Sequence, residues 1–146
     1  MIVPYEIRIV QTDIERAKHR PFIRNTRAAA KVVRKIANLP QEQMAVISLE
    51  GNMRLINIRI VSVGNSNDSV VSFRDILRGP IVDQAYSFIA VHNHPNSTVK
   101  FSKLDRRLFK ELRKAAGYVD IVLMDFVVVH GKKFRSIFED ENYAGY

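Results

Sequence analysis

Hydrophobic and polar positions along the chain predict short strands that alternate with amphipathic helices. Residues 44–49 and 55–63 are rich in Val, Ile and Leu, and the polar stretch 50–52 between them is typical of a β-hairpin. A second hairpin is expected around His130-Gly131. In chain order, the predicted strands are 5–10, 44–49, 55–63, 86–91, 119–129 and 133–138.

Apolar side chains at helical spacing predict helices over 26–37, 73–85 and 102–116. The first helix is expected to begin at Asn25 or Thr26, because short polar side chains cap the free N–H groups of a helix start.

The other two helices contain breaker residues. In the second, Ser72 is the expected cap and Gly79-Pro80 is expected to kink or interrupt the helix. In the third, Gly117 is expected to end the helix. The predicted core-facing row of this third helix is Leu104, Leu108, Leu112 and Ala115.

Together these elements predict an α/β fold, a mixed sheet of about six strands with packed helices. The sequence contains no internal repeat and no low-complexity linker, so residues 1–146 are interpreted as a single domain. Hydrophobic residues make up 47% of the chain, which is enough for a core.

Several features that the sequence lacks limit the classes of protein to which it can belong. No apolar run approaches the length of about 20 residues that spans a bilayer. The first residues lack a secretory signal pattern, so we expect a cytoplasmic protein with no membrane association. The chain has no cysteine, so any metal site must use histidine and carboxylate ligands.

The net charge is +8, from 23 Lys and Arg against 15 Asp and Glu. One interpretation is a solvated basic surface, and another is attraction to a polyanion. Because neither a helix-turn-helix signature nor an aromatic stacking pattern accompanies these cations, we expect weak affinity for nucleic-acid backbones rather than specific reading of bases.

The strongest chemical signal is His92-Asn93-His94-Pro95, at the end of a predicted buried strand. Residues two apart in an extended segment point to the same side, so both imidazoles can face one point. Two convergent histidines suit a borderline-soft cation such as Zn²⁺, which needs a third ligand and an open position in a catalytic site.

Asp105 is the candidate third ligand, because it lies in the first turn of the helix that follows the histidine pair. The stretch Ser102 to Asp105 also resembles a capping box, in which Asp105 only caps the helix. The sequence leaves both interpretations open.

The spaced set His92-x-His94, Ser102 and Asp105 resembles the signature of the JAMM metalloproteases, the JAB/MPN domain superfamily. The resemblance is closest to the RadC-like branch and covers roughly residues 39–138, with 1–38 as a less typical N-terminal strand and helix. The flanking stretches that carry it are 60–64, 74–75 and 90–95. It implies a sandwich similar to that of cytidine deaminases. Longer members of the branch carry an N-terminal helix-hairpin-helix region, which we do not expect within residues 1–38.

The resemblance also implies roles for single residues. Zn²⁺ is the implied cofactor, with His92, His94 and Asp105 as metal ligands. Glu42, which follows Pro40-Gln41 just before a strand as in the family, is the implied general base. Glu50 is its only nearby competitor. Ser102 is the implied donor to an oxyanion. Family members carry histidine where this chain has Phe126, which we expect to fill core space.

The implied activity is hydrolysis of a peptide or isopeptide carbonyl by a zinc-activated water, with a polypeptide or protein conjugate as substrate. Two alternatives follow from the net charge. One is a basic nucleic-acid-associated module, related to DNA repair or replication, with structural or vestigial zinc. The other is a zinc phosphodiesterase.

Overall fold

A five-stranded mixed sheet lies at the centre of the part that the computed structural model describes, residues 20–62, 72–96 and 98–145. Its strands are β1 (Gln43–Leu49), β2 (Leu55–Ser62), β3 (Ser87–Asn93), β4 (Val122–His130) and β5 (Lys133–Ser136). Their order across the sheet is β2-β1-β3-β4-β5, and the β3–β4 pair is parallel while the other pairs are antiparallel. The α/β class and both hairpins are confirmed. The predicted strand 5–10 lies outside the described residues.

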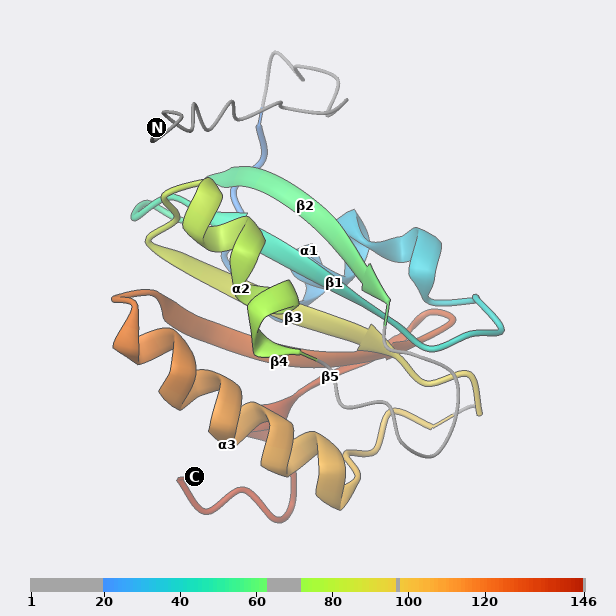
Figure 1. Cartoon of the computed structure of the whole chain (residues 1–146). Coiled ribbons are helices and arrows are strands. Elements are labelled where there is room, and N and C mark those ends of the chain that lie inside the picture. Colours follow the sequence, from blue (N-terminus) through green and yellow to red (C-terminus); the bar gives the residue numbers. More distant parts are fainter. Residues whose placement is uncertain (1–19, 63–71, 97, 146) are drawn as a thin grey trace, which may run out of the picture.

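Helices cover both faces of this sheet (Figure 1). They are α1 (Thr26–Val32), the 3-10 turn η1 (Arg34–Ile36), α2 (Phe73–Val82), α3 (Lys103–Tyr118) and the 3-10 turn η2 (Ile137–Glu139). The helices α2 and α3 share one apolar core with the sheet, and α1 with η1 shares the other. Alternate side chains of β1 enter different cores, Met44 and Val46 the first and Ala45 and Ile47 the second, so the strand is buried throughout.

None of the helices in the described ranges has the length and hydrophobicity that crossing a membrane requires.

The apolar face predicted for α3 is confirmed at Leu112, which is buried, and at Leu108 and Ala115, which are partly buried against the core, but it was wrong at Leu104. Leu104 is 75% exposed. The buried residues of α3 are Asp105, Phe109, Leu112 and Ala116. This rotation buries the large Phe109 ring and turns Asp105 toward the sheet. Gly117 does not end the helix, which continues to Tyr118. The residue with a positive φ after the helix is Asp120, at 58°.

The expected interruption at Gly79-Pro80 was also wrong, because α2 continues through both residues to Val82. Proline has no backbone N–H to donate. Because Pro80 lies in the last turn of α2, the helix loses only one of its final hydrogen bonds. Gly79 lets Arg59 of β2 approach: a Cβ there would lie 2.8 Å from the Cδ and Nη1 atoms of Arg59. The Arg59 guanidinium forms a bidentate ion pair with the buried Asp83, which ties α2 to β2.

Asp125 of β4 fastens α1 to the sheet. Its carboxyl accepts hydrogen bonds from the Thr26 hydroxyl at 3.0 Å and from the Ser136 hydroxyl at 2.6 Å. Burial raises the pKa of the Asp125 carboxyl, and the charge of Glu139 adds to this, although hydrogen bonds from Ser136, Thr26 and the Phe126 N–H act in the opposite direction. The folded protein therefore holds the Asp125 proton more tightly than the unfolded chain does.

The replacement Asp125→Asn is expected to remove one pH dependence of stability. As the pH rises above 3.8, the ordinary pKa of aspartate, unfolded Asp125 loses its proton before folded Asp125 does. The wild type therefore loses free energy of unfolding across this window, up to the raised pKa, and the variant does not. Urea denaturation at a series of pH values measures the difference, with Glu141→Gln, at an exposed position, as the control. A difference between variant and wild type that is constant with pH would contradict this account.

Candidate metal centre

The candidate site lies where β3 ends, beside the N-terminus of α3. His92 is the penultimate residue of β3 and pairs with Met44 of β1 on one side and Val128 of β4 on the other. Its backbone is held from both sides, and its side chain is only 3% exposed. His94 follows the strand, and its N–H donates to the Val129 carbonyl at 3.0 Å.

Both imidazole rings face the carboxylate of Asp105. The His92 Nε2 atom lies 3.4 Å from Asp105 Oδ1, and the His94 Nε2 atom lies 3.2 Å from Asp105 Oδ2. The two rings are nearly perpendicular, with centroids 4.7 Å apart. The structure therefore brings together the three side chains that the sequence suggested as metal ligands.

The capping box at the start of α3 is also present. The Ser102 hydroxyl oxygen accepts the Asp105 N–H at 3.0 Å, and Asp105 Oδ2 accepts the Ser102 N–H at 2.7 Å. The two interpretations of Asp105 are therefore compatible, since one carboxylate caps the helix and faces both histidines. The cap fixes the carboxylate, because Asp105 is buried and held by its own helix.

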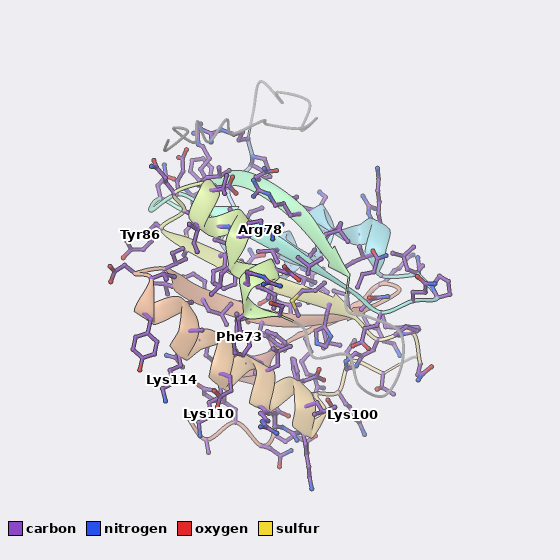
Figure 2. All side chains as sticks on the ribbon, in the orientation of Figure 1. Phe73, Arg78, Tyr86, Lys100, Lys110 and Lys114 are labelled. Atoms are coloured by element: carbon purple, nitrogen blue, oxygen red, sulfur yellow. The ribbon has the colours of Figure 1, made fainter. Side chains whose placement is uncertain are left out.

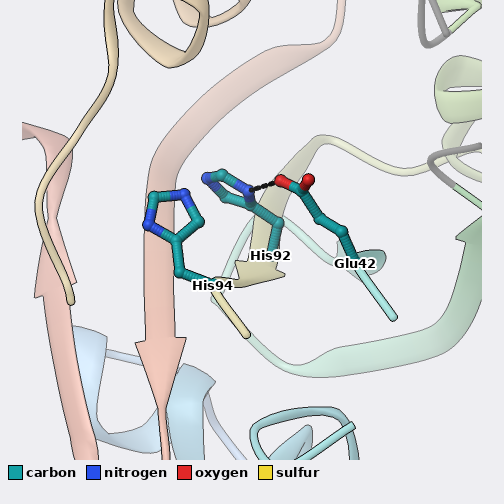
Figure 3. Close-up of side chains that lie close together, drawn as sticks. All are labelled: Glu42, His92 and His94. Carbon is teal, nitrogen blue, oxygen red and sulfur yellow. Dashed lines mark hydrogen bonds and ion pairs between the residues drawn. The ribbon is translucent and has the colours of Figure 1, made fainter. Parts of the chain in front are cut away.

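Glu42 reaches the same histidines from the segment that precedes β1. Its Oε1 atom lies 3.3 Å from His92 Nδ1, and its side chain is 47% exposed (Figure 3). Glu50, the competing acid in the sequence, instead forms an ion pair with Arg20 at the far end of β1. Glu42 is therefore the acid that the fold places beside the histidine pair.

The sequence analysis missed Asn93, which holds the Glu42 segment in place. Its buried side chain accepts the Gln43 N–H at 2.6 Å and donates to the carbonyls of Gln41 at 2.8 Å and Leu39 at 3.2 Å. An amide offers donors and an acceptor at once, which this segment requires. A polar residue in an otherwise apolar buried strand was the available signal, because such a group needs partners.

Hydrogen bonds fix the tautomers of both histidines. The Thr98 carbonyl can only accept, so His94 Nδ1, at 3.1 Å, donates to it. The carboxylate of Glu42 likewise accepts from His92 Nδ1. A neutral ring with its proton on Nδ1 presents the lone pair of Nε2 toward Asp105. The buried Nε2 of His92 has no hydrogen-bond partner among the described residues.

Two lone pairs and a carboxylate that face one another require a cation between them. Burial favours the neutral forms, but the contact with His94, the charge of His92 and the Ser102 N–H lower the pKa of Asp105 overall. Burial acts to lower the pKa of His94, but Asp105, the Thr98 carbonyl and the charge of Glu42 raise it overall. Either a proton or a metal ion satisfies this arrangement, and two nitrogens with one oxygen form a donor set that suits Zn²⁺.

A second set of possible ligands shares the two histidines. One ligand atom from each of Glu42, His92 and His94 lies within 4.8 Å of the other two. The two carboxylates approach different atoms: Asp105 lies 3.4 and 3.2 Å from the Nε2 atoms of His92 and His94, and Glu42 lies 3.3 Å from Nδ1 of His92.

Phe126 and His130 complete the surroundings. The Phe126 ring is fully buried with its centroid 5.1 Å from that of His92, so it fills core space as expected. The Nδ1 atom of His130 lies 2.8 Å from the His94 carbonyl oxygen. His130 thereby supports the backbone that carries His94.

Comparison with protein families gives one clear match. The family model described as the RadC-like JAB domain matches residues 23–143, which include every residue of the candidate site.

Several curated proteins are similar to this chain. A UPF0758 protein of Clostridium acetobutylicum is 32% identical over 113 residues, 77% of this chain and 49% of the relative. Another, of Chlorobium chlorochromatii, is 30% identical over 105 residues, 72% of this chain and 47% of the relative. A third, of Psychrobacter cryohalolentis, is 36% identical over 90 residues, 62% of this chain and 40% of the relative. The chain thus spans less than half the length of these relatives.

Proposed function

Since this chain belongs to the RadC-like JAB domain family, we propose that it is a zinc-dependent hydrolase of the JAMM type with His92, His94 and Asp105 as metal ligands. The observation that carries the proposal is the convergence of two Nε2 lone pairs on one buried carboxylate. The buried Nε2 of His92, which lacks a hydrogen bond within the described residues, supports it further.

Zn²⁺ in a site of this kind would supply a nucleophile near neutral pH, because it lowers the pKa of its bound water to about 7. The surrounding residues prepare the site. Thr98 and Glu42 hold the ring protons on Nδ1, so both Nε2 atoms remain free to coordinate.

Glu42 is the proposed general base. Its carboxylate is half exposed beside His92, so it can reach an attacking water without being a ligand. It takes the proton of that water and delivers it to the leaving group, the two transfers that hydrolysis of an amide or isopeptide requires.

Ser102 is the proposed donor to the oxyanion. Its hydroxyl oxygen accepts the Asp105 N–H, which leaves the O–H proton for a second partner. Ser102 is exposed at the edge of the site, where a substrate carbonyl can approach. Donation to the developing negative charge is typically worth 10²–10³-fold in rate, by the general scale of about 3–4 kcal/mol for one such donor.

Two single replacements separate the proposed ligand from the proposed base. Asp105→Ala is expected to lose zinc, because it removes the carboxylate that faces both Nε2 atoms. Glu42→Gln is expected to keep about one zinc per chain and to lower hydrolysis by about 10²–10⁴-fold. Elemental analysis after removal of free metal gives the stoichiometry, and cleavage of isopeptide-linked protein conjugates gives the rate.

The reverse pattern would assign the metal to Glu42, His92 and His94 instead. Cleavage of phosphodiester substrates by the zinc-loaded wild type, without cleavage of the conjugates, would contradict the proposed bond class. Equal rates for Glu42→Gln and the wild type would show that another group is the base.

A further inference from the structure

The outer face of α3 carries a line of cations that the proposed hydrolysis does not use. Lys103, Arg107, Lys110 and Lys114 are all exposed and are separated by intervals of four, three and four residues. At about 100° and 1.5 Å per residue, they fall within an arc of about 60° and extend over about 16 Å. They therefore form one straight line along the helix.

Packing of the opposite face fixes the direction of this line. Phe109, Leu112 and Ala116 are fully buried against the sheet, so α3 cannot rotate about its axis. Figure 2 labels Lys110 and Lys114 on the side of α3 that points away from the sheet. The cations consequently stay on the surface as a fixed array.

These four cations form no ion pair with a carboxylate of the described residues. Arg106, on the flank of the line, is held by Asp140 at 2.6 Å. Within the described ranges, no carboxylate lies within ion-pair distance of Lys103, Arg107, Lys110 or Lys114. The array is therefore free to bind an external polyanion.

An exposed aromatic ring continues the line. Tyr118 lies four residues beyond Lys114, at the end of α3, and is 80% exposed. A tyrosine in this position contributes little to the core. It does offer a flat face on which a nucleic-acid base can stack.

We propose that Lys103, Arg107, Lys110, Lys114 and Tyr118 form a binding stripe for single-stranded nucleic acid. Phosphates contact the cations and a base stacks on the Tyr118 ring, the combination that single-strand binding uses. A linear polymer of phosphates matches a linear array of cations. Insertion into a lipid surface does not fit, because the apolar face of α3 is already buried in the core. This inference does not rest on the proposed hydrolase function.

The test is the salt dependence of binding to a fluorescein-labelled oligothymidine, measured by fluorescence anisotropy between about 50 and 200 mM salt. The test variant combines Lys103→Gln, Arg107→Gln, Lys110→Gln and Lys114→Gln. Each lost phosphate contact removes about 0.7 from the slope of log affinity against log salt for a single strand, so the slope is expected to fall by about 3. Affinity at the low-salt end is expected to fall at least about tenfold.

A charge-matched control separates the stripe from general basicity. It combines Lys31→Gln, Arg34→Gln, Lys35→Gln and Lys132→Gln, four exposed cations on α1, η1 and the β4–β5 turn. This variant is expected to keep the wild-type slope. Equal losses in both variants, no binding by the wild type, or binding to phosphatidylserine vesicles in place of the oligonucleotide would each overturn the proposal.

The stacking contact has its own readout. Tyr118→Ala is expected to weaken binding to the oligothymidine about tenfold and to leave binding to duplex DNA unchanged, because duplex bases are already stacked. An equal effect on both nucleic acids would contradict stacking on Tyr118. Circular dichroism spectra and thermal unfolding verify that each variant is folded.

Discussion

Replacing both His92 and His94 with alanine is expected to lower zinc binding from about one ion per chain to none. Two of the three proposed ligands are lost, and the remaining carboxylate of Asp105 is already occupied by the Ser102 N–H. Replacing a residue that only hydrogen-bonds to a ligand typically lowers metal affinity about 10–100-fold. The loss of zinc affinity in the double variant is expected to be larger than this. Isothermal titration calorimetry of metal-free protein with zinc measures it.

His130→Ala is the matched control. It also removes an imidazole, but this one contacts only the backbone carbonyl of His94. The control is expected to keep the wild-type stoichiometry. Stoichiometric zinc in the double variant would contradict the proposed ligand set, as would zinc-free wild type that is equally stable with and without chelator.

Asn93→Ala is expected to destabilise the fold, because it removes a buried amide that pairs with the Gln43 N–H and the carbonyls of Gln41 and Leu39. Gln43 and Leu39 are only partly buried and Gln41 is exposed, so water can replace some of these hydrogen bonds. At about 1–3 kcal/mol for a buried unsatisfied group, the expected loss is about 2–3 kcal/mol in free energy of unfolding. Whole domains have only about 5–15 kcal/mol of stability, so the denaturation midpoint should fall markedly.

Ser87→Ala provides the control on the same strand. The Ser87 side chain is also buried in β3, but its hydroxyl has no hydrogen-bond partner among the described residues. Its removal is therefore expected to change the free energy of unfolding by less than about 1 kcal/mol. If the two variants are equally stable, the hydrogen bonds of Asn93 do not support the segment that carries Glu42.

The sequence predicted most of this architecture because its strands and turns are locally encoded. Both hairpins are marked by local turn residues, the polar stretch between β1 and β2 and the pair His130-Gly131 between β4 and β5. The meeting of His92 and Asp105 was predictable too, since their chemistry and spacing follow the family pattern.

Contacts between distant segments could not be predicted in this way. The partners of Asn93 are backbone groups 50 or more residues away, and backbone groups have no sequence signature. The buried face of α3 was misjudged because Leu104 and Phe109 are both apolar, and only the packing shows that Phe109 fills the core. The ion pair between Arg59 of β2 and Asp83 at the end of α2 is likewise a contact between distant segments.

The capping box at the start of α3 has a consequence for the order of assembly. Before α3 docks beside the end of β3, the chain offers an ion only the local His92-x-His94 pair, which is too few ligands for tight capture. On the proposed ligand set the ion therefore enters late, into an already built frame, unlike small zinc modules that need metal in order to fold at all. A ligand that binds only the native state stabilises that state by mass action. The concentration of free zinc should therefore change the stability and lifetime of the folded protein, and not its ability to fold.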